Sequence, residues 1–171
     1  MKTDMILPCC LILLCLSAAG AGADGFGFTF STDTFIPFCQ ADTSPVLPGL
    51  HTRTGVSWLP GDHLEIEIFH IPQLTPRFYS QIFYGFSVGW WLFQRKTTSC
   101  FNVTIDAGVL FSSDLSGFSH TKLLCLQLSP IVLGGPHYSF SDRLLTVGIL
   151  FDPDRQCLVF EMQFLSITLF L

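Results

Sequence analysis

The chain has 171 residues and a formal net charge of −5, with 49% hydrophobic and 12% charged residues. The few cations are scattered, and only Arg95 and Lys96 are adjacent, which excludes the basic stripe of a nucleic-acid binder and a polybasic membrane patch. A single domain of this size has too small an interior to bury so many apolar side chains, so we expect some of them to face another protein.

The N-terminus has the pattern of a secretory signal peptide over residues 1–23. Lys2 precedes an apolar run from Met5 to Leu16, and small residues with A-x-A spacing follow up to Ala23. No later segment is suited to a membrane helix, because the best candidate, residues 158–171, is shorter than the roughly 18 to 20 residues that a helical span needs. We therefore expect a protein of the secretory pathway that contacts membranes only through partners.

The first elements predicted in the mature chain are strands. Residues 25–30 alternate phenylalanine with the smaller residues glycine and threonine, as in a strand or an extended arm. Prolines interrupt the segment that follows, and a Pro-Gly-Asp turn signal at 60–62 precedes residues 63–70. There Leu64, Ile66 and Ile68 alternate with two glutamates, which predicts a half-buried strand with its apolar face in a core and its glutamates in water.

Further strands are predicted to the end of the chain, over residues 78–93 (as two strands or one bent strand), 101–110, 122–128, 144–151 and 157–164, with 165–171 as an extension. Asp152 to Arg155 is typical of a hairpin turn. At most one short helix is expected, over residues 112–119. The predicted fold class is mainly β: small, antiparallel and β-rich. We divide the mature chain into a Pro/Phe-rich part with one strand hairpin, residues 24–76, and a β-rich part, residues 77–171.

Four cysteines remain after cleavage of the signal peptide: Cys39, Cys100, Cys125 and Cys157. In an oxidising compartment an even number predicts two disulfides, and the three possible pairings stay open. Asn102 begins an Asn-Val-Thr sequon, which predicts an exposed, glycan-bearing segment unless the short motif has arisen by chance.

Residues 85–89 match the G-x-S-x-G pattern that presents a nucleophilic serine in many hydrolases, here Ser87. That function needs a strand, a tight turn and a helix, whereas residues 90–93 are aromatic and strand-like. We therefore interpret Gly85 and Gly89 as bends or bulges in a strand and expect no catalytic residue. The histidine and aspartate spacings match no metal motif, so we expect neither a metal nor a cofactor.

Adjacent residues of a strand point to opposite faces, so Trp90 and Trp91 cannot both enter one thin core. Exposed Trp and Phe side chains are favoured anchors for a partner, and an uncharged apolar C-terminus needs a strand to pair with. The predicted partner-interface residues are Trp90, Trp91, Phe93, Phe160, Phe164, Leu169 and Phe170.

The second half of the chain resembles one known family by the order and spacing of short motifs. These are Asn102-Val103-Thr104-Ile105, Thr121-Lys122-Leu123-Leu124, Cys125-Leu126-Gln127-Leu128, Tyr138-Ser139-Phe140-Ser141, Thr146, and Gln156-Cys157 with Phe160, together with Thr34-Phe35 to Cys39 and Trp91-Leu92-Phe93-Gln94-Arg95 near the N-terminal side. The family is that of the largest small accessory glycoprotein in the betaherpesvirus (cytomegalovirus) gH/gL pentameric entry complex. A cysteine expected near Asp62 is missing, and the resemblance carries a disulfide over only to Cys125 and Cys157.

The resemblance implies a secreted, non-enzymatic envelope glycoprotein with a chemokine-like N-terminal part and a β-rich C-terminal part. Such a subunit assembles with gH/gL-type glycoproteins and sibling small subunits on the virion surface, and through them selects a host cell-surface receptor. Two alternatives stay open. One is a soluble immune decoy or receptor-binding module that acts alone, and the other is a secreted serine hydrolase that uses Ser87.

Overall fold

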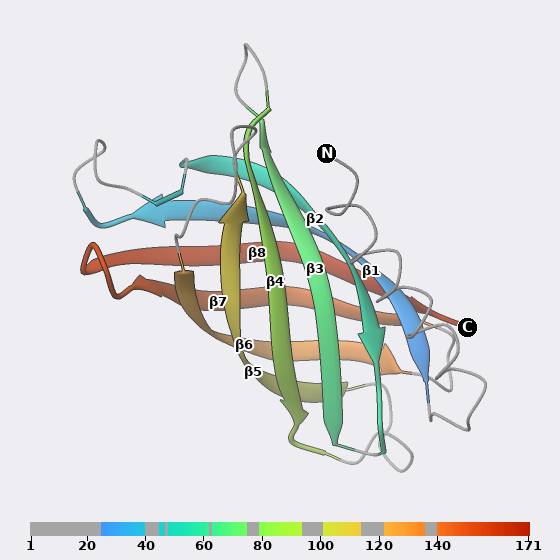
Figure 1. Cartoon of the computed structure of the whole chain (residues 1–171). Coiled ribbons are helices and arrows are strands. Elements are labelled where there is room, and N and C mark those ends of the chain that lie inside the picture. Colours follow the sequence, from blue (N-terminus) through green and yellow to red (C-terminus); the bar gives the residue numbers. More distant parts are fainter. Residues whose placement is uncertain are drawn as a thin grey trace.

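Eight strands form a closed antiparallel barrel in the computed structural model, in which each strand pairs with the next and β8 returns to β1 (Figure 1). The structure describes residues 25–39, 45–46, 48–61, 63–74, 79–93, 101–113, 122–135 and 140–171. The strands are β1 (Phe26–Pro37), β2 (Gly49–Trp58), β3 (Leu64–Leu74), β4 (Tyr79–Trp91), β5 (Phe101–Ser113), β6 (Lys122–Gly135), β7 (Phe140–Asp152) and β8 (Cys157–Phe170). The predicted mainly β, antiparallel fold class is confirmed.

Most strand positions follow the period-two pattern of the sequence, but several boundaries differ from the prediction. Of the two alternatives for residues 78–93, a single strand is found, over residues 79–91, and its pairing with β5 has no register shift at Gly85 or Gly89. Gly108 does not interrupt β5. The segment 165–171 extends β8 as expected. Most of the predicted helix at 112–119 lies outside the described residues, and Ser112 and Ser113 end β5.

The two parts into which we divided the mature chain share one barrel. Residues 26–74 contribute three strands, β1 to β3, where one strand hairpin was expected. β3 pairs with β4 across the predicted boundary, and β1 pairs with β8. The N-terminal part is therefore continuous with the C-terminal part in this fold.

The β7–β8 hairpin forms as predicted at Asp152-Pro153-Asp154-Arg155. Asp152 Oδ1 accepts hydrogen bonds from the backbone N–H groups of Asp154, at 2.9 Å, and Arg155, at 3.1 Å. An aspartate that binds the backbone two residues ahead is the usual stabiliser of such a turn. Gln156 completes the turn with a positive φ of 50°.

The faces of the strands are inverted relative to the expectation for a domain surrounded by water. In β3, Glu65 and Glu67 are only 3% and 4% exposed and face the lumen, whereas Ile66 and Ile68 face outward. The prediction of a buried isoleucine face and a solvated glutamate face was wrong. The alternation was read correctly, but the assignment of its two faces assumed a core lined with apolar side chains.

Candidate functional site

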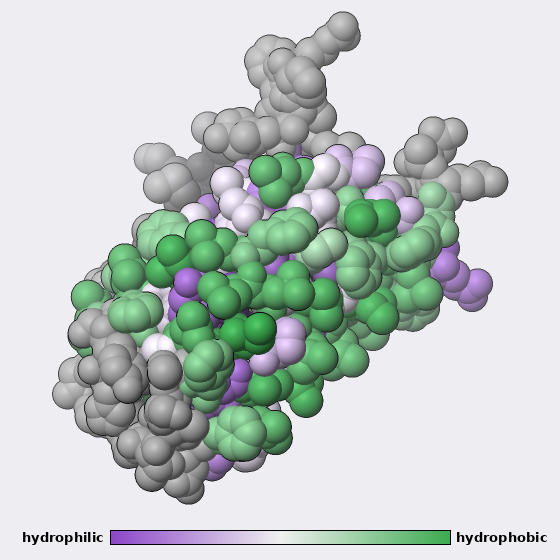
Figure 2. Space-filling view, turned by 180° about the vertical axis from the view of Figure 1, so that it is seen from behind, coloured by the Kyte–Doolittle hydropathy of each residue, from purple (hydrophilic) through white to green (hydrophobic). Residues whose placement is uncertain are grey.

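The outer surface of the barrel is a belt of apolar side chains. Hydrophobic residues cover most of the described surface on the face turned away from the viewer in Figure 1 (Figure 2). Exposed members include Phe86 and Trp90 on β4, Ile105 and Phe111 on β5, Leu124, Leu126 and Leu128 on β6, Ile149 and Phe151 on β7, and Leu158, Phe164 and Leu169 on β8. In the described strands, Lys122 and Asp142 are the charged side chains outside the lumen, and both lie within three residues of a strand end.

Polar residues interrupt this belt on one side of the barrel. Thr32 and Thr34 on β1, Thr52 and Thr54 on β2, and His70 on β3 all face outward. Thr32 pairs with Thr52, and Thr54 pairs with His70. The Thr54 hydroxyl also lies 3.2 Å from a ring nitrogen of His70. We call these five residues the threonine–histidine patch.

The lumen is filled in three layers. The end of the barrel where β1 starts and β8 ends contains a buried apolar cluster of Leu59, Trp91, Val132 and Phe170. The opposite end contains a larger apolar cluster that includes Phe35, Val46, Phe83, Leu123 and Leu150. Charged and polar side chains occupy the space between the two clusters. The charged groups are therefore separated from both mouths of the barrel by apolar packing.

Arg143 bridges opposite walls of the barrel. It lies on β7, and its Nη2 is 2.7 Å from Glu65 Oε2 on β3, while its Nη1 is 3.2 Å from Asp106 Oδ2 on β5. Three strands separate β3 from β7 in either direction around the barrel, so the Arg143–Glu65 pair crosses the lumen. Glu65 Oε2 also accepts a hydrogen bond of 2.8 Å from the indole N–H of Trp91.

A second buried network surrounds Arg53 on β2. Its guanidinium donates to Glu67 and lies 4.0 Å from Glu161, and Gln127 Nε2 donates to the other Glu161 oxygen at 2.6 Å. The Arg53 Cζ atom stacks 3.4 Å from the centroid of the Phe69 ring. A buried charge is tolerated only when it is paired and hydrogen-bonded, which explains why these groups cluster.

Inward-facing glycines make room for these side chains. A Cβ atom at Gly85 would overlap the ring of Phe69, and one at Gly89 would overlap the carboxylate of Asp106. Neither glycine coincides with a register shift in the pairing with β3 or β5, so the bulge expected there was wrong. Their missing side chains admit large groups from neighbouring strands, which is the usual reason for glycine where another group approaches closely.

Ser87 lies within strand β4 and faces the lumen, 2% exposed. Its register partners are Glu67 on β3 and Gly108 on β5. The strand–turn–helix arrangement that presents a nucleophilic serine is not formed at this position. Within the described ranges there is also no group of three His, Cys, Asp or Glu side chains placed to hold a metal ion.

The sequon asparagine is buried instead of exposed. Asn102 is 4% exposed, and its side-chain nitrogen donates to the Phe93 carbonyl at 2.8 Å. Its Oδ1 accepts from the backbone N–H groups of Phe93 and Val103. The predicted exposure of Asn102 is therefore wrong, because its amide is hydrogen-bonded to the backbone of Phe93 and Val103. Glycosylation of this residue stays a prediction.

The cysteine pairing differs from the expectation. Cys39 and Cys157 form a disulfide across 118 residues of sequence, and Cys125 is a free, buried thiol. The Cys125–Cys157 pairing carried over by resemblance is therefore wrong. Cys100 lies outside the described residues. The observed disulfide fastens the end of β1 to the start of β8, where the barrel closes.

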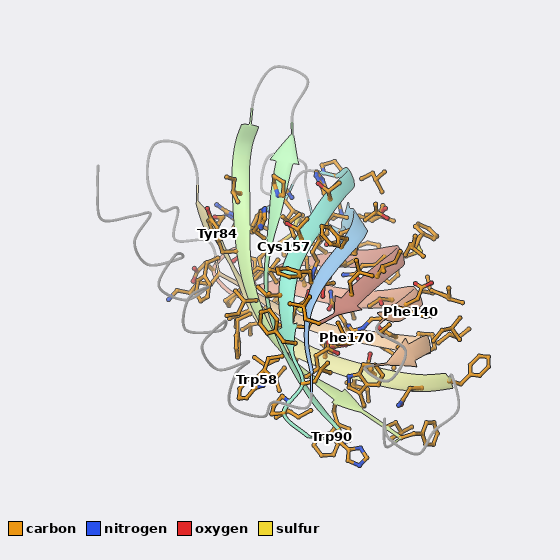
Figure 3. All side chains as sticks on the ribbon, turned by 90° about the vertical axis from the view of Figure 1, so that its right-hand side faces the viewer. Trp58, Tyr84, Trp90, Phe140, Cys157 and Phe170 are labelled. Carbon is orange, nitrogen blue, oxygen red and sulfur yellow. A yellow bond between two sulfur atoms is a disulfide. The ribbon has the colours of Figure 1, made fainter. Side chains whose placement is uncertain are left out.

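The predicted partner-interface residues divide between the two faces. Trp90, Phe93, Phe164 and Leu169 are exposed, and Phe160 is half-buried. Trp91 and Phe170 lie inside the barrel, at 1% and 8% exposure, so they cannot contact a partner at the outer surface. The opposite orientation of Trp90 and Trp91 agrees with the strand argument. Trp58 and Trp90 lie at the same end of the barrel, away from Cys157 (Figure 3).

Sequence reasoning missed the luminal network altogether. A signal was present in the sequence, because the charged residues of the network alternate with outward-facing neighbours. These residues are Arg53, Glu67, Arg143 and Glu161. The described residues contain no helix long and apolar enough to cross a membrane.

No protein-family model and no curated protein matches this chain. Among solved structures, the chain is similar to Ail, the attachment invasion locus protein of Yersinia pestis, solved in complex with the heparin analogue sucrose octasulfate. The identity is 8% and the TM-score 0.38, with 86% of this chain and 97% of Ail covered.

Proposed function

We propose that this chain is a membrane-spanning β-barrel that serves as a sealed anchor in a lipid bilayer. The single observation that carries the proposal is the inverted polarity of the wall: most outward side chains on five consecutive strands are apolar, while two arginines and six carboxylates of the strands are buried inside. A transmembrane barrel needs this arrangement, because its lipid-facing positions must be apolar and its backbone must be paired within the sheet.

The dimensions of the strands support the proposal. They contain 10 to 14 residues, and a tilted strand of about 9–11 residues spans the hydrocarbon core of a bilayer. Trp58 and Trp90 project outward at one end of the barrel, where His63 stacks on Trp90 with ring centroids 5.2 Å apart. Tryptophan favours the boundary between hydrocarbon and lipid headgroups, so these residues suit one edge of the belt.

The filled lumen favours an anchor over a channel. An ion or small solute would have to pass both apolar clusters and the Arg143–Glu65 pair that crosses the lumen. Eight strands enclose an interior just wide enough for side chains to fill. We therefore expect no conductance from the intact barrel, and its contacts with other molecules are made by its rims and outer wall.

The alternative is that proteins cover the apolar exterior instead of lipid. Assembly with gH/gL-type glycoproteins, inferred from the sequence resemblance, stays a prediction and would supply such partners. The two cases differ in what touches Trp90. Lipid acyl chains would reach its indole in a protein reconstituted alone, whereas a protein partner would be required to shield it in the other case.

The test uses the native tryptophans. The protein is folded into vesicles whose acyl chains carry bromine, a fluorescence quencher, and the W58F variant is compared with the W58F/W90F variant, which retains only Trp91. We expect strong quenching of the Trp90 contribution and little quenching of Trp91, which is enclosed in the lumen. Equal, weak quenching of both, with release of the protein from the vesicles by alkaline carbonate, would refute membrane insertion.

A further inference from the structure

Apolar side chains border the threonine–histidine patch at both of its ends along the strands. Toward the end of the barrel where β1 starts, the next outward residues are Phe30 on β1, Val56 on β2 and Ile68 on β3. Toward the other end they are Ile36 on β1 and Leu50 on β2, which are 44% and 69% exposed. The polar residues therefore interrupt the apolar wall and do not continue to a polar rim on β1 and β2.

The neighbouring strands border the patch with apolar and aromatic side chains. On β8, Met162 pairs with Thr34, and the outward Phe164 is 56% exposed. On β4, Tyr84 pairs with His70 and is 46% exposed. The patch is therefore enclosed on the outer wall by residues that suit contact with lipid or with an apolar protein surface.

The position of the patch along β2 places it at the depth of the hydrocarbon when Trp58 marks one edge of the belt. Thr54 and Thr52 precede Trp58 by four and six residues. At about 3.3 Å per residue and a strand tilt of ~40°, they lie about 10–15 Å from that edge, within a belt about 25 Å tall. His70 pairs with Thr54 and Thr32 pairs with Thr52, so these residues lie at similar depths. The patch thus presents hydrogen-bonding groups where acyl chains offer no partner.

The side chains of the patch are complementary to a second copy of themselves. Thr52 and His70 are exposed, and the other three members are half-buried. Each threonine hydroxyl has one donor and two acceptor sites, and a neutral imidazole has one of each, so the contact between Thr54 and His70 uses only part of this capacity. The patch contains no Asp, Glu, Lys or Arg side chain, so two copies can face each other without repulsion between fixed charges. Small threonine side chains also allow two walls to approach closely.

We propose that the threonine–histidine patch is the interface of a homodimer within the bilayer, which rests on the proposed membrane insertion and names the partner of this part of the wall. Copies that insert in one direction hold the patch at the same depth, so a two-fold axis along the membrane normal brings patch to patch. With that axis beside β2, the β2 strands of the two copies face each other, and Thr32 of one copy faces His70 of the other. A different partner would have to match the patch in both chemistry and depth, whereas a second copy matches both by symmetry.

The first measurement is oxidative cross-linking of the full-length protein, folded into preformed vesicles so that all copies insert from one side. Thr52→Cys places a thiol beside the two-fold axis and should give a covalent dimer, because a disulfide forms when two Cα atoms come within about 7 Å. The matched control is Leu126→Cys, an exposed position on β6 across the barrel, which should give only the background of the unsubstituted protein. Equal yields from the two positions, or no dimer from either, would overturn the interface.

The second measurement follows energy transfer between donor-labelled and acceptor-labelled copies as the vesicles are diluted with lipid. The variant T52V/T54V/H70L removes three hydrogen-bonding groups from the patch and should weaken the dimer ~10-fold or more, because polar contacts contribute to association within a bilayer. The control L124V/L126V/L128V changes the same number of outward side chains on β6 and should leave the dimer unchanged. Equal weakening by both variants, or by neither, would overturn the role of the patch.

Quenching of Trp90 by brominated lipid in the same vesicles separates the two proposals. A strongly quenched Trp90 in a protein that stays monomeric at every lipid ratio would overturn the dimer alone. An unquenched Trp90 would overturn membrane insertion and the dimer that rests on it. Strong quenching together with a dimer that depends on Thr52, Thr54 and His70 is the result we expect.

Discussion

The two sides of the barrel wall differ in both pairing and polarity. From β4 to β8 the outward positions are apolar except for Lys122 and Asp142 near strand ends, and each strand is joined to the next along most of its length. From β1 to β3 the wall carries the threonine–histidine patch, and its β2–β3 ladder ends at Thr54–His70. Hydrogen-bonding side chains and an incomplete ladder coincide on the same strands. We interpret the first side as a surface for an apolar environment and the second as a more polar surface.

The luminal networks hold these two sides together. Arg143 on β7 reaches Glu65 on β3, and Arg53 on β2 reaches Glu67 on β3 and approaches Glu161 on β8. These charges do not line a path between solvent compartments, because apolar clusters lie beyond them at both ends. The ion pairs instead connect β2 and β3 to β5, β7 and β8 across the lumen, which compensates for the short ladder between β2 and β3.

The largest expected effect comes from removing the bridge between the two sides. Arg143→Leu leaves Glu65 and Asp106 buried without their cation, which should lower the free energy of unfolding by about 3–5 kcal/mol. The measurement is urea unfolding in detergent or vesicles, followed by tryptophan fluorescence. The control is the triple variant R143L/E65L/D106L, which removes the charges together and should recover part of the loss. No recovery would indicate that the bridge acts through packing and not through charge.

A charge on the outer wall tests the difference between its two sides directly. Leu126→Arg on β6 places a cation in the middle of the apolar belt and should cost about 2–4 kcal/mol in a bilayer. Thr52→Arg on β2, within the threonine–histidine patch, should cost about 1 kcal/mol or less, since that position is already polar and the flexible side chain can reach a polar boundary. The two unfolding free energies are compared in vesicles of one composition. Equal costs would mean that both sides of the wall face the same environment.

The inward glycine of β4 tests how closely the two sides pack. Gly85→Ala introduces a Cβ atom where the Phe69 ring lies, so Phe69 and the Arg53 group stacked on it must shift. Overpacking of this kind should cost about 1–3 kcal/mol. Phe69→Leu in the same background relieves the overlap and should restore part of the stability. If Gly85→Ala alone is neutral in a thermal unfolding experiment, Phe69 has another accommodating rotamer.

The sequence predicted the strands far better than it predicted which face of each strand was buried. Alternation in residues 63–70 correctly located β3, because strand periodicity depends on local geometry alone. The prediction that Glu65 faces water was wrong. The same alternation fits a strand whose apolar face lies inside the barrel and one whose apolar face lies outside it. β2 was missed because its His-Thr-Arg-Thr stretch lacks apolar alternation. Its strand conformation comes from pairing with β1, a long-range contact.

The candidate site was less accessible to sequence reasoning than the fold. Trp90 and Trp91 were correctly placed on opposite faces, but whether either face was a lumen depended on closure of β1 with β8. The Cys39–Cys157 pairing depended on the same closure, because it joins residues that only the closed barrel brings together.

The smallest expected effect concerns the end of the β2–β3 ladder at Thr54 and His70. Thr54→Val keeps the shape of the side chain but removes the hydroxyl that lies against His70, at the last pair of the β2–β3 ladder. The loss should be about 0.5–1 kcal/mol for one hydrogen bond, partly offset where lipid covers the position. Its informative readout is local: amide exchange at residues 54–56 should rise, whereas exchange in β6 should stay unchanged. Val56→Thr, at the next outward position within the ladder, is the matched control. If Thr54→Val leaves exchange at residues 54–56 unaltered, backbone pairing alone sets where the ladder ends, and the threonine–histidine contact only marks that place.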